Sequence, residues 1–200
     1  MRSLDLGCGS RKTADTFGAD LSRGSDADVI ADLDHVHYPF AGNTFDRVVL
    51  NHVIEHLIDV PGAVAEIWRI AVDGGVLEGR TPHFSSSASY VDPTHRHHFA
   101  FRTFEFLARR DLRLGVLRRC LGVFYRLEDP DHTPDVARKF EQIDVRLTFN
   151  PLLRRLGIEW AANIYPELYE AFFAFILPAR DIVFRLKAVK CVPQSLASSP

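Results

Sequence analysis

The first residues that could perform chemistry lie in LDLGCGS, which begins at Leu4. Gly7 and Gly9 stand one residue apart and directly follow an apolar run that also contains Asp5. Glycine lets a backbone come close to a ligand, and the N–H groups of such a loop can bind a carboxylate. The pattern therefore predicts a strand that ends in a ligand-binding loop, with an ordinary tight turn as the alternative.

Further polar residues follow other apolar runs at short intervals. They are Asp20 after FGA, Asp32 after DVIA, and Asn51 after DRVVL. Ligands of an open parallel sheet bind beyond the carboxyl ends of its strands, so these residues are expected to line one crevice. A carboxylate such as that of Asp20 has enough lone pairs to accept hydrogen bonds from both hydroxyls of a ribose.

A second group of chemically competent side chains comes directly after Asn51. His52, Glu55 and His56 lie at positions i, i+3 and i+4, which places them on one face of a helical turn. Two imidazoles and a carboxylate in that arrangement could transfer a proton, bind a divalent cation or only support the fold. We expect a catalytic role for His52 and assign no metal ligand, while a divalent metal and a purely structural role stay as alternatives.

More histidines crowd the stretch PHFSSSASYVDPTHRHHF, which spans residues 82–99. Its prolines and serines predict a long loop over one edge of the sheet. Within it, His83 and His95 are expected to be catalytic, as a general base for a hydroxyl or carboxyl acceptor. Two alternatives are that a loop histidine completes a metal site with His56, and that the histidines only fasten the loop to the sheet.

The elements that must position these residues follow from the recurrence of short apolar runs, which is typical of a parallel sheet. Strands are expected at residues 3–6, 16–21, 28–31, 46–51 and 76–80, with an amphipathic helix near 60–71 that stops at Gly74-Gly75. The first two connections are too short for a full crossover helix.

The second half of the chain reads less clearly. We expect a helix within 102–119, a strand near 142–149, an aromatic segment at 165–177 that packs on the sheet, and a strand at 181–190. The predicted fold class is α/β, with a Rossmann-like, mostly parallel sheet, shortened early crossovers and an antiparallel C-terminal strand. Residues 1–190 are expected to form a single domain, and residues 191–200 a disordered tail.

Composition restricts the classes of partner. The 200 residues include 24 Lys and Arg against 26 Asp and Glu, which gives a net charge of −2, so no nucleic acid is expected. The chain has no run of 18 apolar residues that would predict a transmembrane segment. The three widely spaced cysteines favour a reducing cytoplasm. An oligomer is compatible with all of this.

Five stretches together resemble the class I S-adenosylmethionine-dependent methyltransferases of the small "type 11" kind. They are LDLGCGS, GADLS, ADVIADLD, FAGNTFDRVVLNHVIEHL and EIWRIAVDGGVLEGRTPHF, within residues 4 to about 105. The resemblance implies S-adenosylmethionine as cofactor, and it implies cofactor contacts from the residues at the predicted strand ends, namely Asp5, Gly7, Gly9, Asp20, Leu21, Asp32, Leu33 and Asn51. Arg11 stands where the family usually has a third glycine.

The function expected from these residues is methyl transfer to a small-molecule acceptor, at an oxygen or a nitrogen atom. One alternative is a degenerate cofactor-binding protein, or a scaffold subunit that depends on a partner and has no catalysis of its own. Another is the binding of NAD or a nucleotide sugar on the same type of sheet, although the first loop lacks the third glycine that would hold a pyrophosphate.

Overall fold

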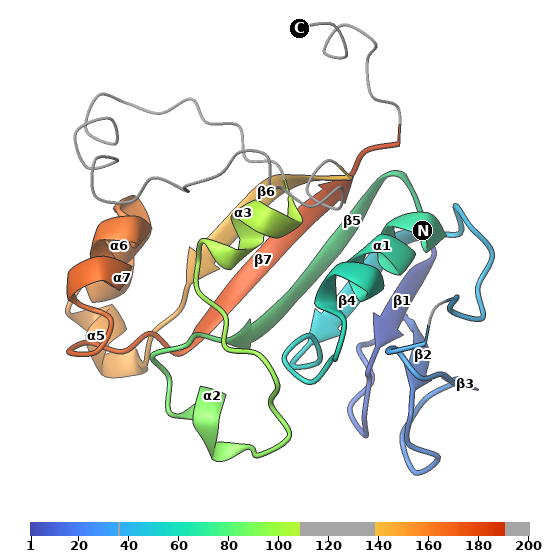
Figure 1. Cartoon of the computed structure of the whole chain (residues 1–200), viewed down its shortest axis with the longest axis horizontal. Helices are drawn as coiled ribbons and strands as arrows, with labels where there is room; N and C mark the ends of the chain where they lie inside the picture. Colours follow the sequence, from blue (N-terminus) through green and yellow to red (C-terminus); the bar gives the residue numbers. More distant parts are fainter. Residues whose placement is uncertain (36, 109–138, 191–200) are drawn as a thin grey trace, which may run out of the picture.

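The computed structural model describes residues 1–35, 37–108 and 139–190, and within them one seven-stranded sheet organises the chain (Figure 1). The strands are β1 (Ser3–Leu6), β2 (Phe17–Asp20), β3 (Val29–Ile30), β4 (Phe45–Asn51), β5 (Ala71–Pro82), β6 (Phe140–Leu147) and β7 (Asp181–Ala188). The helices are α1 (Val60–Ile70), α2 (Ala88–Val91), α3 (Thr103–Leu107), α5 (Pro151–Arg155), α6 (Ile158–Ile164) and α7 (Pro166–Phe172).

The strand order is β3-β2-β1-β4-β5-β7-β6. The first five strands are parallel to one another, whereas β7 runs antiparallel to both β5 and β6. The expected α/β fold with an antiparallel C-terminal strand is therefore confirmed. Because β1, β2, β4 and β5 point the same way, their carboxyl ends meet at one edge of the sheet, which is where the predicted site residues lie.

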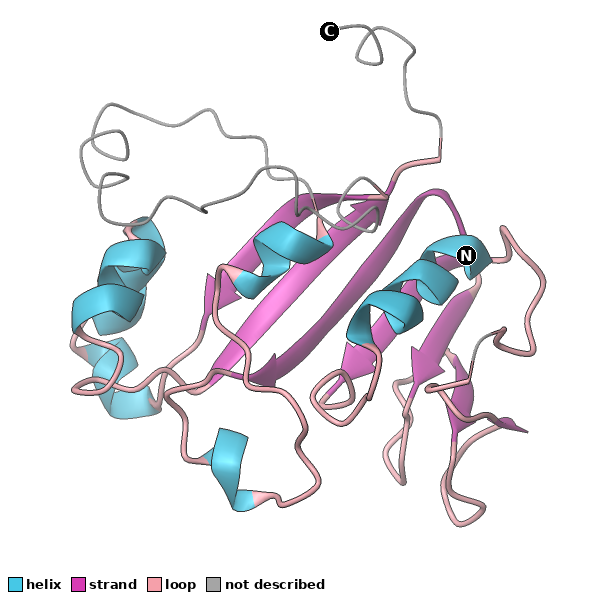
Figure 2. Cartoon of the chain, viewed as in Figure 1, coloured by secondary structure: helices cyan, strands magenta, loops and turns pink. Residues whose placement is uncertain are grey.

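The shortened early crossovers are also confirmed. Residues 7–16 and 21–28 connect β1 to β2 and β2 to β3 as loops without a helix (Figure 2). Asp28 joins the two loops, since one carboxylate oxygen accepts a hydrogen bond from the N–H of Gly18 at 2.7 Å and another from Lys12 Nζ at 2.8 Å. These bonds replace part of the support that a crossover helix would give.

Helix α1 begins where the sequence predicts and buries the apolar face that the sequence predicts. The Asp59 side chain accepts a hydrogen bond from the N–H of Gly62 at 2.9 Å, and Pro61 occupies the first turn. The helix ends at Ile70, within one residue of its expected end, but Gly74-Gly75 is not its stop signal, because the chain enters β5 directly after Ile70. Gly74-Gly75 instead lies in an irregular part of β5, where the pairing with β4 shifts register.

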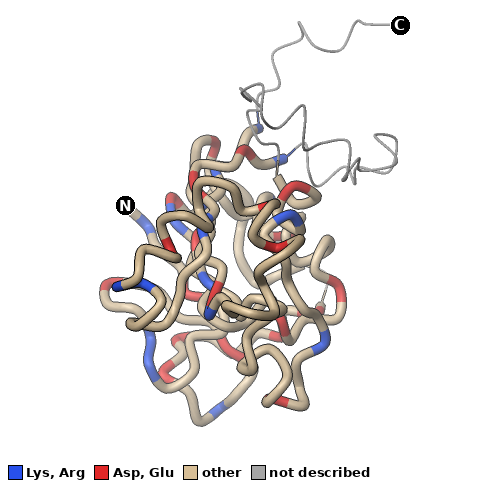
Figure 3. The backbone as a smooth tube through the Cα atoms, turned by 90° about the vertical axis from the view of Figure 1, so that its left-hand side faces the viewer, with Lys and Arg blue, Asp and Glu red and all other residues tan. Residues whose placement is uncertain are grey.

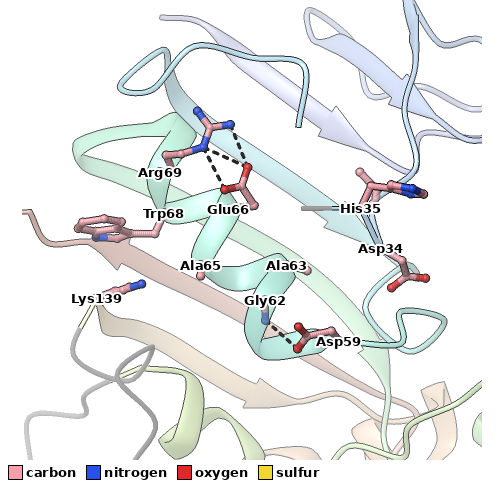
Figure 4. A pocket seen from close by; sticks show the side chains of 11 residues that line it. Asp34, His35, Asp59, Gly62, Ala63, Ala65, Glu66, Trp68, Arg69 and Lys139 are labelled. Atoms are coloured by element: carbon pink, nitrogen blue, oxygen red, sulfur yellow. Dashed lines mark hydrogen bonds and ion pairs between the residues drawn. The ribbon is translucent and has the colours of Figure 1, made fainter. Parts of the chain in front are cut away.

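The outer face of α1 holds the loop that follows β3. Burial alone would raise the pKa of the Glu66 carboxyl. Hydrogen bonds from Arg69 and from the N–H of Tyr38 outweigh burial, so the pKa is lowered. Figure 4 shows Glu66 and Arg69 paired beside a cavity of about 350 Å³ on this face, with Trp68 and Lys139 at one end. The glycine loop contributes no residue to that cavity.

The aromatic segment expected to pack on the sheet does so only in part. Tyr169 and Ala174 are 4% and 1% exposed and belong to the core. Phe172 and Phe175, in contrast, are 62% and 82% exposed. The segment forms α7 and the turn after it, and α7 lies with α5 and α6 beside β6 instead of over a face of the sheet (Figure 1).

Several expectations fall in parts that the structure does not describe. Only α3, at residues 103–107, represents the helix predicted within 102–119, and residues 109–138 and the tail at 191–200 lie outside the described ranges. Among the described residues, no helix has the length and apolar character needed to cross a membrane. Basic and acidic residues are interspersed over the backbone in the view of Figure 3.

Candidate active site

The loop after β1 adopts a conformation that favours glycine at both predicted positions. Gly7 has φ +68° and Gly9 has φ +54°, in the left-handed region that other residues rarely enter. The N–H of Gly7 donates to the carbonyl of Ala19 at 2.7 Å, and the N–H of Asp26 donates to the carbonyl of Gly9 at 2.8 Å. The loop is thus fastened to β2 and to the next loop.

The two glycines differ in their surroundings. A Cβ placed on Gly7 would overlap the side chain of Val53, whereas one placed on Gly9 would have no heavy atom within 4 Å. Gly7 is therefore packed against the turn after β4. Gly9 faces open space, where a ligand could approach the backbone.

We expect Gly7→Ala to lower the free energy of unfolding through two independent effects. The left-handed backbone costs roughly 1–2 kcal/mol for a residue with a Cβ, and the overlap with Val53 costs about 1–3 kcal/mol more. Gly9→Ala is the matched control, because it carries the backbone cost without the overlap. Urea unfolding of both variants measures the difference, and equal losses would contradict the packing of Gly7 on Val53.

Asp20 organises the next loop and keeps unused hydrogen-bonding capacity. Its Oδ2 accepts from the N–H of Gly9 and its Oδ1 from the N–H of Ser22, both at 2.8 Å. A carboxylate offers about four lone-pair sites, so each oxygen can still accept a further bond from a hydroxyl. Asp5 is 3% exposed, and its Oδ2 accepts a hydrogen bond from the N–H of Thr13 at 2.7 Å. Asp5 therefore fixes the loop after β1 through a buried hydrogen bond.

The other predicted cofactor residues lie at the expected strand ends but differ in exposure. The hydrogen bond from the N–H of Asp34, and then one from His35, lowers the pKa of Asp32, which keeps this carboxylate ionised. Leu33 is only 8% exposed and belongs to the core, and it lines the cavity beside α1, to which the glycine loop contributes no residue. Leu21 is 67% exposed beside Asp20, and Asn51 is exposed at the end of β4.

Cys8 lies between the two glycines and is not a nucleophile in this arrangement. Burial raises the pKa of its thiol, and the nearby carboxylates of Asp20 and Asp5 raise it further. The thiol therefore stays protonated and fills space beneath the loop.

His52 stands at the end of β4 with a carboxylate behind it. Its Nδ1 lies 3.3 Å from Oε1 of Glu55, and the other Glu55 oxygen accepts a hydrogen bond from Thr81 Oγ1 at 3.1 Å. A carboxylate accepts, so Nδ1 carries the proton and the lone pair of the neutral ring lies on Nε2. The His52 side chain is 47% exposed, whereas Glu55 is 1% exposed. This pair can receive a proton at an accessible nitrogen.

His83 has surroundings that favour a structural role. Its side chain is fully buried, with Nδ1 at 2.8 Å from Ser85 Oγ and Nε2 at 3.0 Å from Oε1 of Glu170. The same Glu170 oxygen accepts the N–H of Phe101, which ties α7 to two loops. His95 is also mostly buried, with 8% of its side chain exposed, and packs against the ring of His56. Of the three predicted catalytic histidines, only His52 has a largely exposed side chain.

Three residues of this region were not anticipated from the sequence. Thr81, Thr94 and Glu170 bond to Glu55, His56 and His83, at sequence separations of 26, 38 and 87 residues. Pairs so far apart in the chain produce no local spacing pattern. Only the arrangement of β5, its loop and α7 brings them together.

The residues at the ends of β1 and β2 fit an adenosyl ligand with an amino-acid end. The open space at Gly9 allows close backbone approach, and Asp20 has acceptor capacity left for ribose hydroxyls. Asp32, at the end of β3, supplies a second carboxylate on the same edge of the sheet.

Part of the chain matches a known protein family. Residues 4–78 match the family model described as a methyltransferase domain. No curated protein sequence matches the chain.

Solved structures share the fold at low sequence identity. A SAM-dependent methyltransferase from Archaeoglobus fulgidus is 16% identical with a TM-score of 0.57, and the match covers 93% of this chain and 85% of that one. The [4+2]-cyclase SpnF is 16% identical with a TM-score of 0.54, over 95% and 75%. The complex of the Haloferax volcanii Trm112 methyltransferase activator with a protein named as a methyltransferase is 14% identical with a TM-score of 0.54, over 94% and 83%.

Proposed function

Because the chain has the fold of the class I S-adenosylmethionine-dependent methyltransferases and its residues 4–78 match their domain, we propose that it methylates an oxygen or nitrogen atom of a small-molecule acceptor. One observation carries the proposal: the open, acceptor-rich loop of Gly9 and Asp20 lies on the same sheet edge as the exposed His52. Cofactor and acceptor would thus meet beyond the carboxyl ends of β1, β2 and β4.

The residues of the crevice have separate tasks in this proposal. The sulfonium of bound S-adenosylmethionine activates the methyl group. N–H groups around Gly9 would bind the amino-acid carboxylate, and Asp20 would accept bonds from the ribose hydroxyls. Alignment of the acceptor contributes roughly 7–11 kcal/mol. His52 Nε2 would take the acceptor's proton, while Glu55 holds the ring and stabilises its charged form.

Calorimetry with S-adenosylhomocysteine tests the cofactor assignment. We expect binding of one molecule per chain that an excess of NAD does not displace, because the first loop lacks a third glycine for a pyrophosphate. Transfer of a labelled methyl group to a panel of phenols, carboxylic acids and amines then tests the chemistry. Displacement by NAD, or no binding of either ligand, would contradict the proposal.

A second candidate is a partner-dependent protein. Loops replace helices in both early crossovers, so the cofactor side of the sheet has less cover than full crossover helices would give. One structure with this fold is a complex with a methyltransferase activator, and another is a [4+2]-cyclase, so the fold alone does not fix the activity. Binding of S-adenosylhomocysteine without transfer to any acceptor of the panel would favour this second candidate.

A further inference from the structure

A group of chelating side chains lies where the turn after β4 contacts the loop after β5. The N–H groups of Arg96 and His97 donate to the carbonyl of Glu55 at 2.8 and 3.3 Å, which fixes the loop against the turn. As a result, one ligand atom from each of Glu55, His56 and His95 lies within 4.8 Å of the other two. The two imidazole rings are 4.7 Å apart, centroid to centroid.

The hydrogen bond of His95 determines which of its nitrogens can bind a ligand. Its Nδ1 lies 3.1 Å from the carbonyl oxygen of Ser89. A carbonyl can only accept, so Nδ1 carries the hydrogen and the neutral ring has its lone pair on Nε2. Asp92 Oδ2 lies 4.0 Å from that Nε2.

His56 is also held in the tautomer that has its hydrogen on Nδ1, through two hydrogen bonds that link it to Thr94 and Asp92. The hydroxyl of Thr94 donates its hydrogen to Asp92 Oδ1 at 2.6 Å. The same hydroxyl oxygen lies 2.9 Å from His56 Nδ1, so it can only accept there, and Nδ1 must carry the hydrogen. The lone pair of neutral His56 is therefore also on Nε2. Metal-binding histidines usually have the second nitrogen engaged in this manner.

The third member supplies negative charge in a buried position. Glu55 is 1% exposed, and its two known partners, His52 and Thr81, use one lone pair on each oxygen. A lone pair on each oxygen remains, because a carboxylate has about four such sites. Burial of a carboxylate is costly unless hydrogen bonds or a cation offset its charge, and a metal ion at this position would do so.

We propose that Glu55, His56 and His95 bind a divalent transition-metal ion of the first row. Two imidazole nitrogens and one carboxylate oxygen form a ligand set for Zn²⁺, Fe²⁺ or Co²⁺ and leave further coordination positions open. With bonds of about 2.1 Å, each ligand atom would move inward by less than about 1 Å. None of the three ligands lies in the loops of Gly9 and Asp20, so metal binding can be tested without the cofactor. Glu55 also contacts His52, so the site adjoins the catalytic pair of the proposed function.

Titration of the full chain with Co²⁺ tests the site, by calorimetry and by the ligand-field absorption of the bound ion. We expect one Co²⁺ per chain, displaced by Zn²⁺ but not by Mg²⁺, since Mg²⁺ prefers oxygen ligands. His56→Gln and His95→Gln should each weaken Co²⁺ binding at least about 100-fold. Thr94→Val, which removes only the bond that orients His56, should weaken it about 10- to 100-fold.

His98→Gln is the matched control, because His98 is an exposed histidine of the same loop outside the group. It should leave Co²⁺ affinity unchanged, and a thermal unfolding curve checks that every variant folds. No Co²⁺ binding by the unaltered protein, displacement by Mg²⁺, or equal binding by His95→Gln and His98→Gln would each overturn the proposal. Binding of S-adenosylhomocysteine is measured separately, so failure here is distinct from failure of the proposed function.

Discussion

Asp20→Asn is expected to weaken the binding of S-adenosylhomocysteine at least about 100-fold. The two bonds from the ribose hydroxyls to the carboxylate would each contribute roughly 1.5–3 kcal/mol, and every 1.4 kcal/mol changes affinity about tenfold. In asparagine an NH2 group replaces one of the two oxygens, so a donor would face the N–H of Gly9 or of Ser22 and that hydrogen bond would be lost. The substitution therefore removes ligand contacts and also loosens the loop. Calorimetry measures the loss.

The control for this experiment is Asp26→Asn. Asp26 is exposed and lies in the loop that follows Asp20, so its replacement changes the net charge equally. Its affinity for S-adenosylhomocysteine should match that of the unaltered protein. If Asp20→Asn binds as tightly as Asp26→Asn, then Asp20 does not hold the ribose and the cofactor would have to lie elsewhere.

His52→Asn is expected to reduce methyl transfer by about 10² to 10⁴, the range for loss of a positioned general base. Affinity for S-adenosylhomocysteine should stay unchanged, because the substitution leaves the Gly9 and Asp20 loops intact. Asparagine is chosen because His52 has φ +56°, and asparagine adopts this left-handed conformation more readily than most residues. Labelled methyl transfer to an acceptor identified in the panel measures the effect.

His37→Asn provides a control with the same backbone requirement. His37 has φ +73° and a side chain that is 78% exposed, and it lies near Glu66 on α1 instead of at the end of β4. Its replacement should leave transfer unchanged. Full transfer by His52→Asn would refute the role of His52 as the base. Transfer is therefore measured over a range of pH, because an acceptor that loses its proton without a base would restore transfer by His52→Asn at high pH only.

The early fold could be predicted from the sequence because it depends on local patterns. Apolar runs that end in Asp, Asn or Gly specify buried parallel strands, and β1, β2 and β4 lie within about two residues of their expected bounds. The start of α1 was predictable as well, because Asp59 and Pro61 act on the residues next to them. The role of Gly74-Gly75 was not predictable, since the pair resembles a helix stop but accommodates an irregularity in β-strand pairing.

The sequence by itself determined that glycine and aspartate stand at the strand ends, because a run of apolar residues followed by one of them specifies both the strand and its polar end. Only the tertiary structure decided the roles of the histidines. His52, His83 and His95 have similar side chains, but their partners Glu55, Glu170 and Ser89 come from different elements. A histidine's tautomer and exposure depend on those partners, which sequence spacing does not specify.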